Sequence, residues 1–212
     1  MDRRVFLEKS VLAAGCIFLS STGIESLANE NTKKMNIVVI TGSPRRNGNT
    51  NHMADQFIKG AKEAGHEVFR FDAATRDVKP CLGCNHCGMD GPCVYKDDFS
   101  NVLRPQLEKA DMVVFCSPMY YFGFSAQIKH VIDRFYAINS AIHGRKKTAF
   151  LMAYANTAAS DAEPMIAHYK RIASYMGWED VGMVIAPGIW PVGAVNGTEY
   201  ATQAYELGKS LA

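Results

Sequence analysis

The chain has 212 residues, of which 48% are apolar and 21% are charged, and its formal net charge is +2. The near balance of 23 basic and 21 acidic residues argues against a nucleic-acid binder. No apolar run reaches the ~18 residues expected of a membrane span. A chain of this length can bury one core without disulfide staples, so we expect one globular domain.

Residues 1–30 have the three-part plan of an export signal: a positive start, a modestly apolar segment, and small residues before a cleavage site. The paired Arg3 and Arg4 resemble a twin-arginine signal, which predicts an exported, periplasmic protein. An ordinary amphipathic first helix is one alternative. A lipid anchor at Cys16 is another, because the residues before it partly match a lipobox. Residues 31–212 are then the folded domain.

Short apolar runs in this domain predict strands buried on both faces, and stretches with helical spacing of apolar residues follow them. The expected strands lie at residues 37–40, 68–71, 112–115, 150–152 and 181–185. The expected helices lie at residues 49–64, 128–135, 165–176 and 198–211. This alternation predicts an α/β fold with a parallel sheet covered on both faces. Ligands of such folds bind at the carboxyl ends of strands, so we expect function in the loops after the first, third and fourth strands.

The loop after the first strand, residues 41–50, has features of a phosphate site. Two glycines allow tight turns, and the hydroxyls of Ser43 and Thr50 can donate to phosphate oxygens at the start of a helix. Five residues separate Gly42 from Gly48, which excludes a Walker A loop, and no G-x-G-x-x-G fingerprint is present. A plain turn from strand to helix is the structural alternative.

Two segments in this order, TGSPRRNGNT at 41–50 and SPMYYFG at 117–123, resemble the phosphate and isoalloxazine loops of flavodoxin-fold NAD(P)H-dependent FMN reductases. The resemblance covers about residues 36–210. It implies a flavodoxin-like three-layer fold with a five-stranded parallel sheet, FMN as cofactor and NAD(P)H as co-substrate. The residues implied to hold the FMN phosphate and ribityl chain are Ser43, Arg45, Asn47, Asn49 and Thr50. Those implied to surround the ring are Pro118, Met119, Tyr120, Phe122 and Gly123.

Two details of this resemblance leave alternatives. The aromatic residues of the second segment also suit ordinary core or subunit packing. The loop after the fourth strand, at residues 154–157, lacks the glycine that the family pattern implies, so its contact with the ring is less well defined.

Four of the six cysteines fall in the loop 81–93, with the spacing C-x-x-C-x-x-C followed by a fourth cysteine after five residues. Such close spacing lets one loop present four thiolates to a common centre, as iron–sulfur clusters require. The pattern resembles the compact motif of iron–sulfur flavoproteins, which implies a [4Fe–4S] cluster held by Cys81, Cys84, Cys87 and Cys93. Disulfides, zinc and unligated thiols remain alternatives, and an oxidising compartment would favour disulfides.

Two functions from different classes fit these observations. One is an enzyme that takes hydride from a nicotinamide nucleotide onto FMN and passes electrons to a quinone or another small-molecule or protein acceptor. The other is a non-enzymatic electron carrier between protein partners. The sequence shows no dedicated acid–base residue, and the resemblance implies a homodimer or homotetramer.

Overall fold

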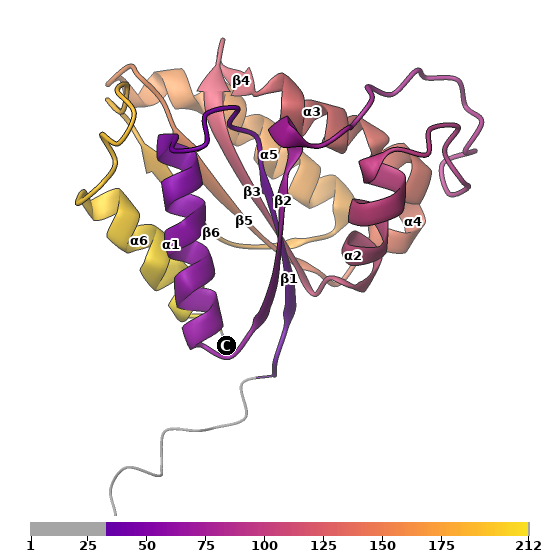
Figure 1. The fold of residues 1–212 in the computed structure, drawn as a ribbon, viewed down its shortest axis with the longest axis horizontal. Helices are drawn as coiled ribbons and strands as arrows, with labels where there is room; N and C mark the ends of the chain where they lie inside the picture. Colours follow the sequence, from indigo (N-terminus) through magenta and orange to yellow (C-terminus); the bar gives the residue numbers. More distant parts are fainter. Residues whose placement is uncertain (1–32, 212) are drawn as a thin grey trace, which may run out of the picture. The chain divides into compact units, whose positions relative to one another are not determined.

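A sheet of parallel strands forms the centre of the computed structural model, which describes residues 33–211 (Figure 1). The parallel strands lie in the spatial order β2-β1-β3-β5-β6, and β4 pairs antiparallel with the end of β3. The strands are β1 (Asn36–Thr41), β2 (Glu67–Asp72), β3 (Met112–Tyr120), β4 (Gly123–Phe124), β5 (Lys147–Ala153) and β6 (Glu179–Ala186). The predicted flavodoxin-like fold with five parallel strands is confirmed.

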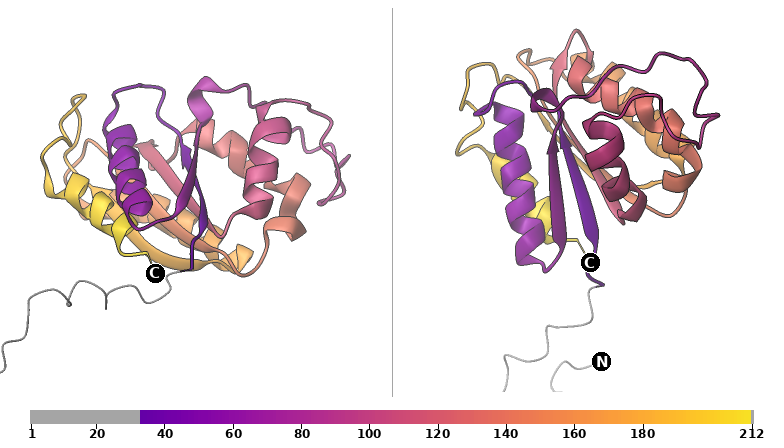
Figure 2. Two further views of the ribbon diagram at one scale, coloured as in Figure 1. Left: turned by 60° about the horizontal axis from the view of Figure 1, so that its bottom comes forward. Right: turned by 45° about the vertical axis from the view of Figure 1, so that its right-hand side comes forward.

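Helices cover both faces of the sheet as two layers (Figures 1 and 2). One layer is α1 (Asn49–Glu63) and α6 (Glu199–Lys209). The other is built mainly from α2 (Arg104–Lys109), α3 (Ala126–Asp133) and α5 (Glu163–Met176). The shorter elements are η1 (Ala73–Thr75), the π-helical turn η2 (Phe99–Leu103), η3 (Arg134–Ile138), α4 (Asn139–Ile142) and η4 (Ala159–Ala162). No helix among residues 33–211 is both long and apolar enough to cross a bilayer.

The central strands are apolar on both sides because each side meets a helix layer. In β1, Ile37 and Val39 pack with α1 and α6, whereas Val38 and Ile40 pack with the opposite layer. All four side chains are at most 2% exposed. The uninterrupted apolar run that predicted this strand therefore reflects a position in the middle of the sheet.

Helices α1 and α6 approach each other unusually closely, and a glycine on each helix permits this contact. A Cβ atom on Gly60 would lie 2.1 Å from the carbonyl oxygen of Tyr205. A Cβ atom on Gly208 would lie 2.2 Å from the carbonyl oxygen of Phe57. Glycine inside a helix costs stability relative to alanine, so close packing explains why it stands here.

The structure differs from the expectation at the third strand, which continues through the residues predicted to be a loop. The end of β3 turns into β4, so that Met119 pairs with Phe124 and Tyr120 with Gly123. Pairing with β5 also extends as far as Pro118. The β4 pairing is a tight local hairpin, whereas the β5 pairing joins segments distant in sequence. The apolar pattern that ended the predicted strand at residue 115 indicated neither.

The chain reverses its direction of travel across the sheet between β1 and β3. It leaves β1, forms β2 on one side, and returns to form β3 on the other. In folds with this strand order, the loops at the carboxyl ends of the two adjacent strands diverge and leave a crevice, and flavodoxins bind FMN at this point. The topology therefore points to the loops that follow β1 and β3.

Candidate functional site

A cleft of about 410 Å³ lies at this reversal, and we call it the switch-point cleft. Segments at the carboxyl ends of β1, β3, β5 and β6 form its walls. Its lining residues are Ser43, Arg45, Gly48, Asn49, Thr50, Pro118, Met119, Tyr120, Tyr121, Ala153, Tyr154, Ala155, Ile189 and Trp190. Seven of the ten residues predicted to contact the cofactor are among them. The other three, Asn47, Phe122 and Gly123, do not line the cleft.

The loop between β1 and α1 is folded tightly around a helix N-terminus. The Gly42 N–H donates to the Cys116 carbonyl at 2.9 Å, which ties the loop to β3. A Cβ atom on Gly48 would lie 2.7 Å from the Ser43 Oγ and 2.9 Å from the Arg45 carbonyl oxygen, so the fold of the loop favours glycine there. Gly48 precedes α1, and no side chain caps this helix end. Free N–H groups at a helix N-terminus attract anions, so the loop fits a phosphate group.

Asn49 has a role that its place in the motif did not indicate. Its side-chain N–H donates to the Pro191 carbonyl at 2.8 Å, and its side-chain oxygen accepts from the Val195 N–H at 3.3 Å. Both polar atoms of the amide therefore tie the start of α1 to the segment after β6. Asn49 lines the cleft, but its amide is engaged in positioning that segment.

An aromatic turn forms a second wall of the cleft. Tyr120 and Tyr121 line it, and Tyr121 and Phe122 occupy the turn between β3 and β4 with φ angles of 47° and 64°. Bulky residues rarely adopt this left-handed region, and a turn with two such angles normally uses asparagine or glycine. The side chain of Tyr121 is completely exposed. The turn thus holds large aromatic faces in solvent at the rim of the cleft.

The segment after β6 contributes residues that sequence reasoning missed. Ile189 and Trp190 line the cleft, and the guanidinium carbon of Arg45 lies 5.9 Å from the centre of the Trp190 ring. From the sequence we expect function only after the first, third and fourth strands. The carboxyl end of the fifth strand lies at the same edge of the sheet, so the rule that favoured the other loops also applies to this one.

Cys116, at the centre of β3, has a packing role. It is fully buried, and its S–H donates to the Thr50 carbonyl at 2.9 Å. Burial raises the pKa of this thiol far above its usual range. A thiol that stays protonated is a poor nucleophile, so Cys116 serves as a small buried side chain.

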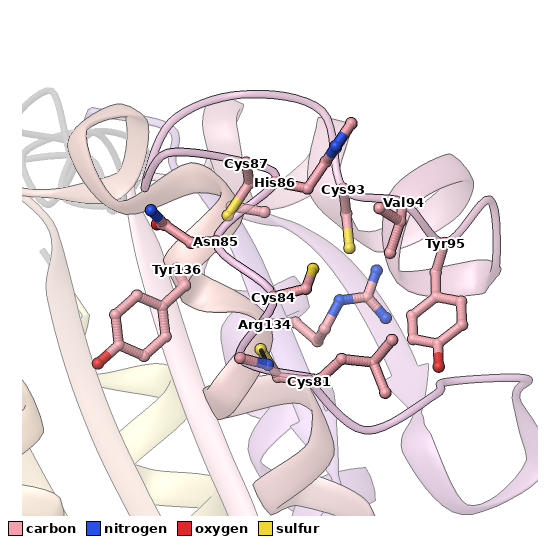
Figure 3. Close-up of a pocket in the computed structure, with 13 residues that line it drawn as sticks. Cys81, Cys84, Asn85, His86, Cys87, Cys93, Val94, Tyr95, Arg134 and Tyr136 are labelled. Carbon is pink, nitrogen blue, oxygen red and sulfur yellow. Dashed lines mark hydrogen bonds between the residues drawn. The ribbon is translucent and has the colours of Figure 1, made fainter.

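A second hollow, of about 300 Å³, lies beside the loop between η1 and η2, and we call it the cysteine hollow (Figure 3). Four free thiols line it together with residues of η3. The lining residues are Cys81, Leu82, Gly83, Cys84, Asn85, His86, Cys87, Cys93, Val94, Tyr95, Arg134, Tyr136 and Ala137. The cysteine hollow shares no lining residue with the switch-point cleft. Within residues 33–211, no three His, Cys, Asp or Glu side chains are placed to hold one metal ion.

A buried ion pair anchors the two ends of the cysteine loop to η3. Arg134 Nη1 donates to Asp97 at 2.7 Å and to the Lys79 carbonyl at 3.0 Å. Asp97 also accepts from the Lys79 N–H at 2.9 Å. Burial by itself would raise the pKa of Asp97, but the hydrogen bonds from Arg134 and from the backbone N–H groups of Lys79 and Ser100, together with the charge of Arg134, outweigh burial and hold that pKa below its usual value.

The middle of the same loop is held against α4 and α2. The Asn139 N–H donates to the Met89 carbonyl at 3.2 Å, and the Ser140 N–H donates to Asp90 at 2.6 Å. Arg104 of α2 donates to the Gly91 carbonyl at 3.3 Å. The loop is therefore fixed at both ends and in its middle, although most of its side chains face solvent.

Comparison with known proteins agrees with this geometry. A family model described as NADPH-dependent FMN reductase matches residues 35–196. An iron-sulfur flavoprotein of Archaeoglobus fulgidus is 32% identical over 180 residues, which cover 84% of this chain and 79% of that protein. An iron-sulfur flavoprotein of Methanocaldococcus jannaschii is 36% identical over 100 residues, or 47% of this chain and 51% of that protein. An NAD(P)H:quinone oxidoreductase from Methanothermobacter marburgensis shares the fold, with a TM-score of 0.68 at 19% identity over 84% of this chain and 96% of that one.

The family match overturns the prediction of an exported, periplasmic protein. The predicted signal at residues 1–30 and the alternative lipid anchor at Cys16 lie outside the described residues. The matched family is described as NADPH-dependent FMN reductase, and the match gives no support for an export signal. The predicted localisation is therefore wrong, and the support that an oxidising compartment lent to disulfides is lost with it.

The family model covers the phosphate loop, the aromatic turn and the cysteine loop in one continuous match. The strand order and the position of the switch-point cleft agree with a flavin-binding fold. Membership of a reductase family also favours the enzyme over the electron carrier. The chain belongs to the NADPH-dependent FMN reductase family and is an FMN-dependent NAD(P)H oxidoreductase.

Proposed function

We propose that this enzyme binds FMN in the switch-point cleft, is reduced there by a nicotinamide nucleotide, and passes the electrons to a quinone or another small-molecule or protein acceptor. One observation carries the proposal: the cleft joins an uncapped helix N-terminus to an aromatic wall. The first suits a phosphate and the second suits a flat ring system. The structural neighbour named as an NAD(P)H:quinone oxidoreductase supports a quinone as acceptor.

The phosphate end of the cofactor would lie in the loop before α1. Ser43 and Thr50 are 7% and 2% exposed, and both line the cleft, so their hydroxyls can donate to phosphate oxygens in a site of low water content. The Arg45 guanidinium, held near the Trp190 ring, adds positive charge at the same end. Asn47 is exposed outside the cleft, and we assign it no contact.

The ring end of the cofactor would lie against β3 and the aromatic turn. Pro118 and Met119 line the cleft at the end of the strand, and Tyr120 continues this wall. Tyr154 and Trp190 line the cleft after β5 and β6. Bound FMN would supply hydride acceptance and release of electrons, so the task of the chain is to bind and orient it.

The phosphate assignment is tested by replacing Ser43 and Thr50 together with alanine. Loss of charge-assisted hydrogen bonds costs about 1–3 kcal/mol, which raises the Kd for FMN by about 5- to 150-fold. The matched control replaces two exposed hydroxyl residues on and after α6, Thr202 and Ser210, with alanine. Equal FMN affinity in both double variants would remove the loop from the site. Kd is measured by quenching of FMN fluorescence.

We also propose that Cys81, Cys84, Cys87 and Cys93 hold a [4Fe–4S] cluster. The donor set fits, because four free thiols line one hollow and thiolates are the ligands of such clusters. A four-iron cluster spreads its ligands more widely than a single metal ion does, so the absence of a one-ion site within residues 33–211 does not exclude it. The names of the two relatives above support iron–sulfur chemistry. Bound there, a cluster would supply a one-electron store.

Chemical analysis tests the cluster. Anaerobically purified protein should contain about four irons and four acid-labile sulfides per chain. Cys84→Ser should reduce both numbers while FMN stays bound. Cys116→Ala is the control, because that cysteine lies outside the hollow and should leave both unchanged. Metal-free protein whose loop cysteines resist alkylation until they are reduced would instead establish disulfides.

We further propose that the enzyme is a homodimer or homotetramer. Large aromatic side chains at the cleft rim and on η3 and α5 are exposed in the single chain, which is unusual unless a partner covers them. They are Tyr120, Tyr121, Phe122, Tyr136, Tyr175 and Trp190. Light scattering at micromolar concentration is the test, and a monomer that still binds FMN would contradict the proposal.

A further inference from the structure

Arg134 lies at the base of the cysteine hollow with one hydrogen-bond donor unused. The residue is 1% exposed, and its guanidinium carries five N–H groups. Nη1 donates to Asp97 and to the Lys79 carbonyl, and Nη2 donates to Asp97 at 3.2 Å and to the Ser100 hydroxyl at 3.1 Å. Two acceptors thus serve each terminal nitrogen. The Nε–H has no partner within the described part of the chain.

Arg134 borders the cysteine hollow, and two aromatic rings pack against its guanidinium. The rings of Tyr95 and Phe99 pack against the guanidinium, with their centres 5.3 and 4.7 Å from its carbon. Arg134 lines the same hollow as the four cysteines, and Figure 3 shows its side chain close to Cys84 and Cys93 in that view. The charge of the guanidinium is therefore paired with Asp97, and its faces pack against the two rings. Only the Nε–H remains available to donate to a ligand.

A buried N–H without an acceptor costs about 1–3 kcal/mol, and native proteins rarely leave one. A neutral thiol is a weak acceptor, whereas a negatively charged sulfur accepts a strong, charge-assisted hydrogen bond. With four free thiols the Nε–H lacks a suitable partner. With metal-bound thiolates in the hollow it would have one.

We propose that the Arg134 Nε–H donates a hydrogen bond to a sulfur atom of the thiolate-bound centre, and so sets its reduction potential as well as its position. The inference rests on the proposed cluster and deepens it. Hydrogen bonds to cluster sulfurs stabilise the more negative, reduced state and raise the potential. Asp97 largely offsets the positive charge of Arg134, so the hydrogen bond is the main difference that this residue makes.

The test compares Arg134→Lys with Arg104→Lys. Lysine at position 134 can keep the charge and the pairing with Asp97 but has no Nε–H in the same place. Arg104 is the matched control because it also donates to the cysteine loop, at Gly91, but does not line the hollow. Iron and sulfide content, FMN content and the potential of the centre are measured, the last by anaerobic reductive titration followed by visible and electron paramagnetic resonance spectra.

The expected result is a lower cluster potential in Arg134→Lys, with FMN content and FMN potential unchanged, and wild-type values in Arg104→Lys. A cluster of unchanged potential in Arg134→Lys would overturn the inference and leave the proposed cluster standing. Wild-type protein that takes up no iron or sulfide would overturn both. Should Arg134→Lys not fold, the neutral pair Arg134→Gln with Asp97→Asn keeps a buried hydrogen bond and should lower the potential in the same way.

Discussion

Replacing Asp97 with alanine should be among the most damaging single changes to the folded state. The side chains of Asp97 and Arg134 are 3% and 1% exposed, so the pair is shielded from water. Besides Arg134, the carboxylate accepts from the N–H groups of Lys79 and Ser100 at 2.9 and 3.3 Å. Without it, a buried guanidinium has no counter-charge, and breaking such a pair costs about 3–5 kcal/mol. For a chain of this size the melting temperature falls by about 6–20 °C.

The stability lost in Asp97→Ala should be smaller at acid pH than at neutral pH. The pKa of Asp97 is lowered in the folded state from its ordinary value of 3.8. A group with a lowered pKa contributes stability above its ordinary pKa and loses that contribution as the pH falls through its folded value. The difference in free energy of unfolding between wild type and Asp97→Ala is therefore largest near neutral pH and becomes smaller below about pH 4.

Urea unfolding of the FMN-loaded protein, followed by circular dichroism at pH 7 and again below pH 4, measures this gap. The control is Glu67→Gln, which removes an exposed ion pair with Lys34 whose side chains are 61% and 64% exposed. Exposed pairs contribute little, so this variant should stay close to wild type. If Asp97→Ala costs no more than the control, or costs the same at both pH values, the buried pair does not hold the loop as described.

Three further outcomes follow from the packing. Gly60→Ala should destabilise the fold by several kcal/mol in urea unfolding, because its Cβ would lie 2.1 Å from the Tyr205 carbonyl; wild-type stability would mean that α6 moves aside freely. Trp178→Phe removes the donor to the buried Ile142 carbonyl at 2.7 Å and should lower the free energy of unfolding by about 1–3 kcal/mol in the same assay. An unchanged free energy of unfolding would mean that water replaces the lost donor. At concentrations too low for association, Tyr121→Gly should raise the melting temperature, because the φ of 47° costs about 1–2 kcal/mol for a non-glycine residue; a lower melting temperature there would show that the ring packs within its own chain.

Features that depend on neighbours in sequence can be recognised from a local pattern of residues. The apolar run of β1 reflects burial on both faces of the sheet, and the four consecutive apolar residues were enough to predict it. The glycines, the hydroxyls and the following helix of the phosphate loop lie within ten residues, and so does most of the cysteine pattern. Such features depend on backbone turns and on helix ends, which are local, so the sequence alone indicated the fold class and the two candidate sites.

Contacts between distant segments were decided only by the tertiary structure. Even a helix end shows this limit: Thr198 is the N-cap residue of α6, but no side chain caps the helix, and the Thr198 hydroxyl instead donates to the Val195 carbonyl at 2.7 Å. Trp190 reaches the cleft because β6 ends at the same sheet edge as β1. Arg134 lies under the cysteine loop because Asp97, 37 residues away, compensates its buried charge. The residues that pair with a buried charge, or that meet at a sheet edge, can come from any part of the chain, so a local pattern of residues does not predict them.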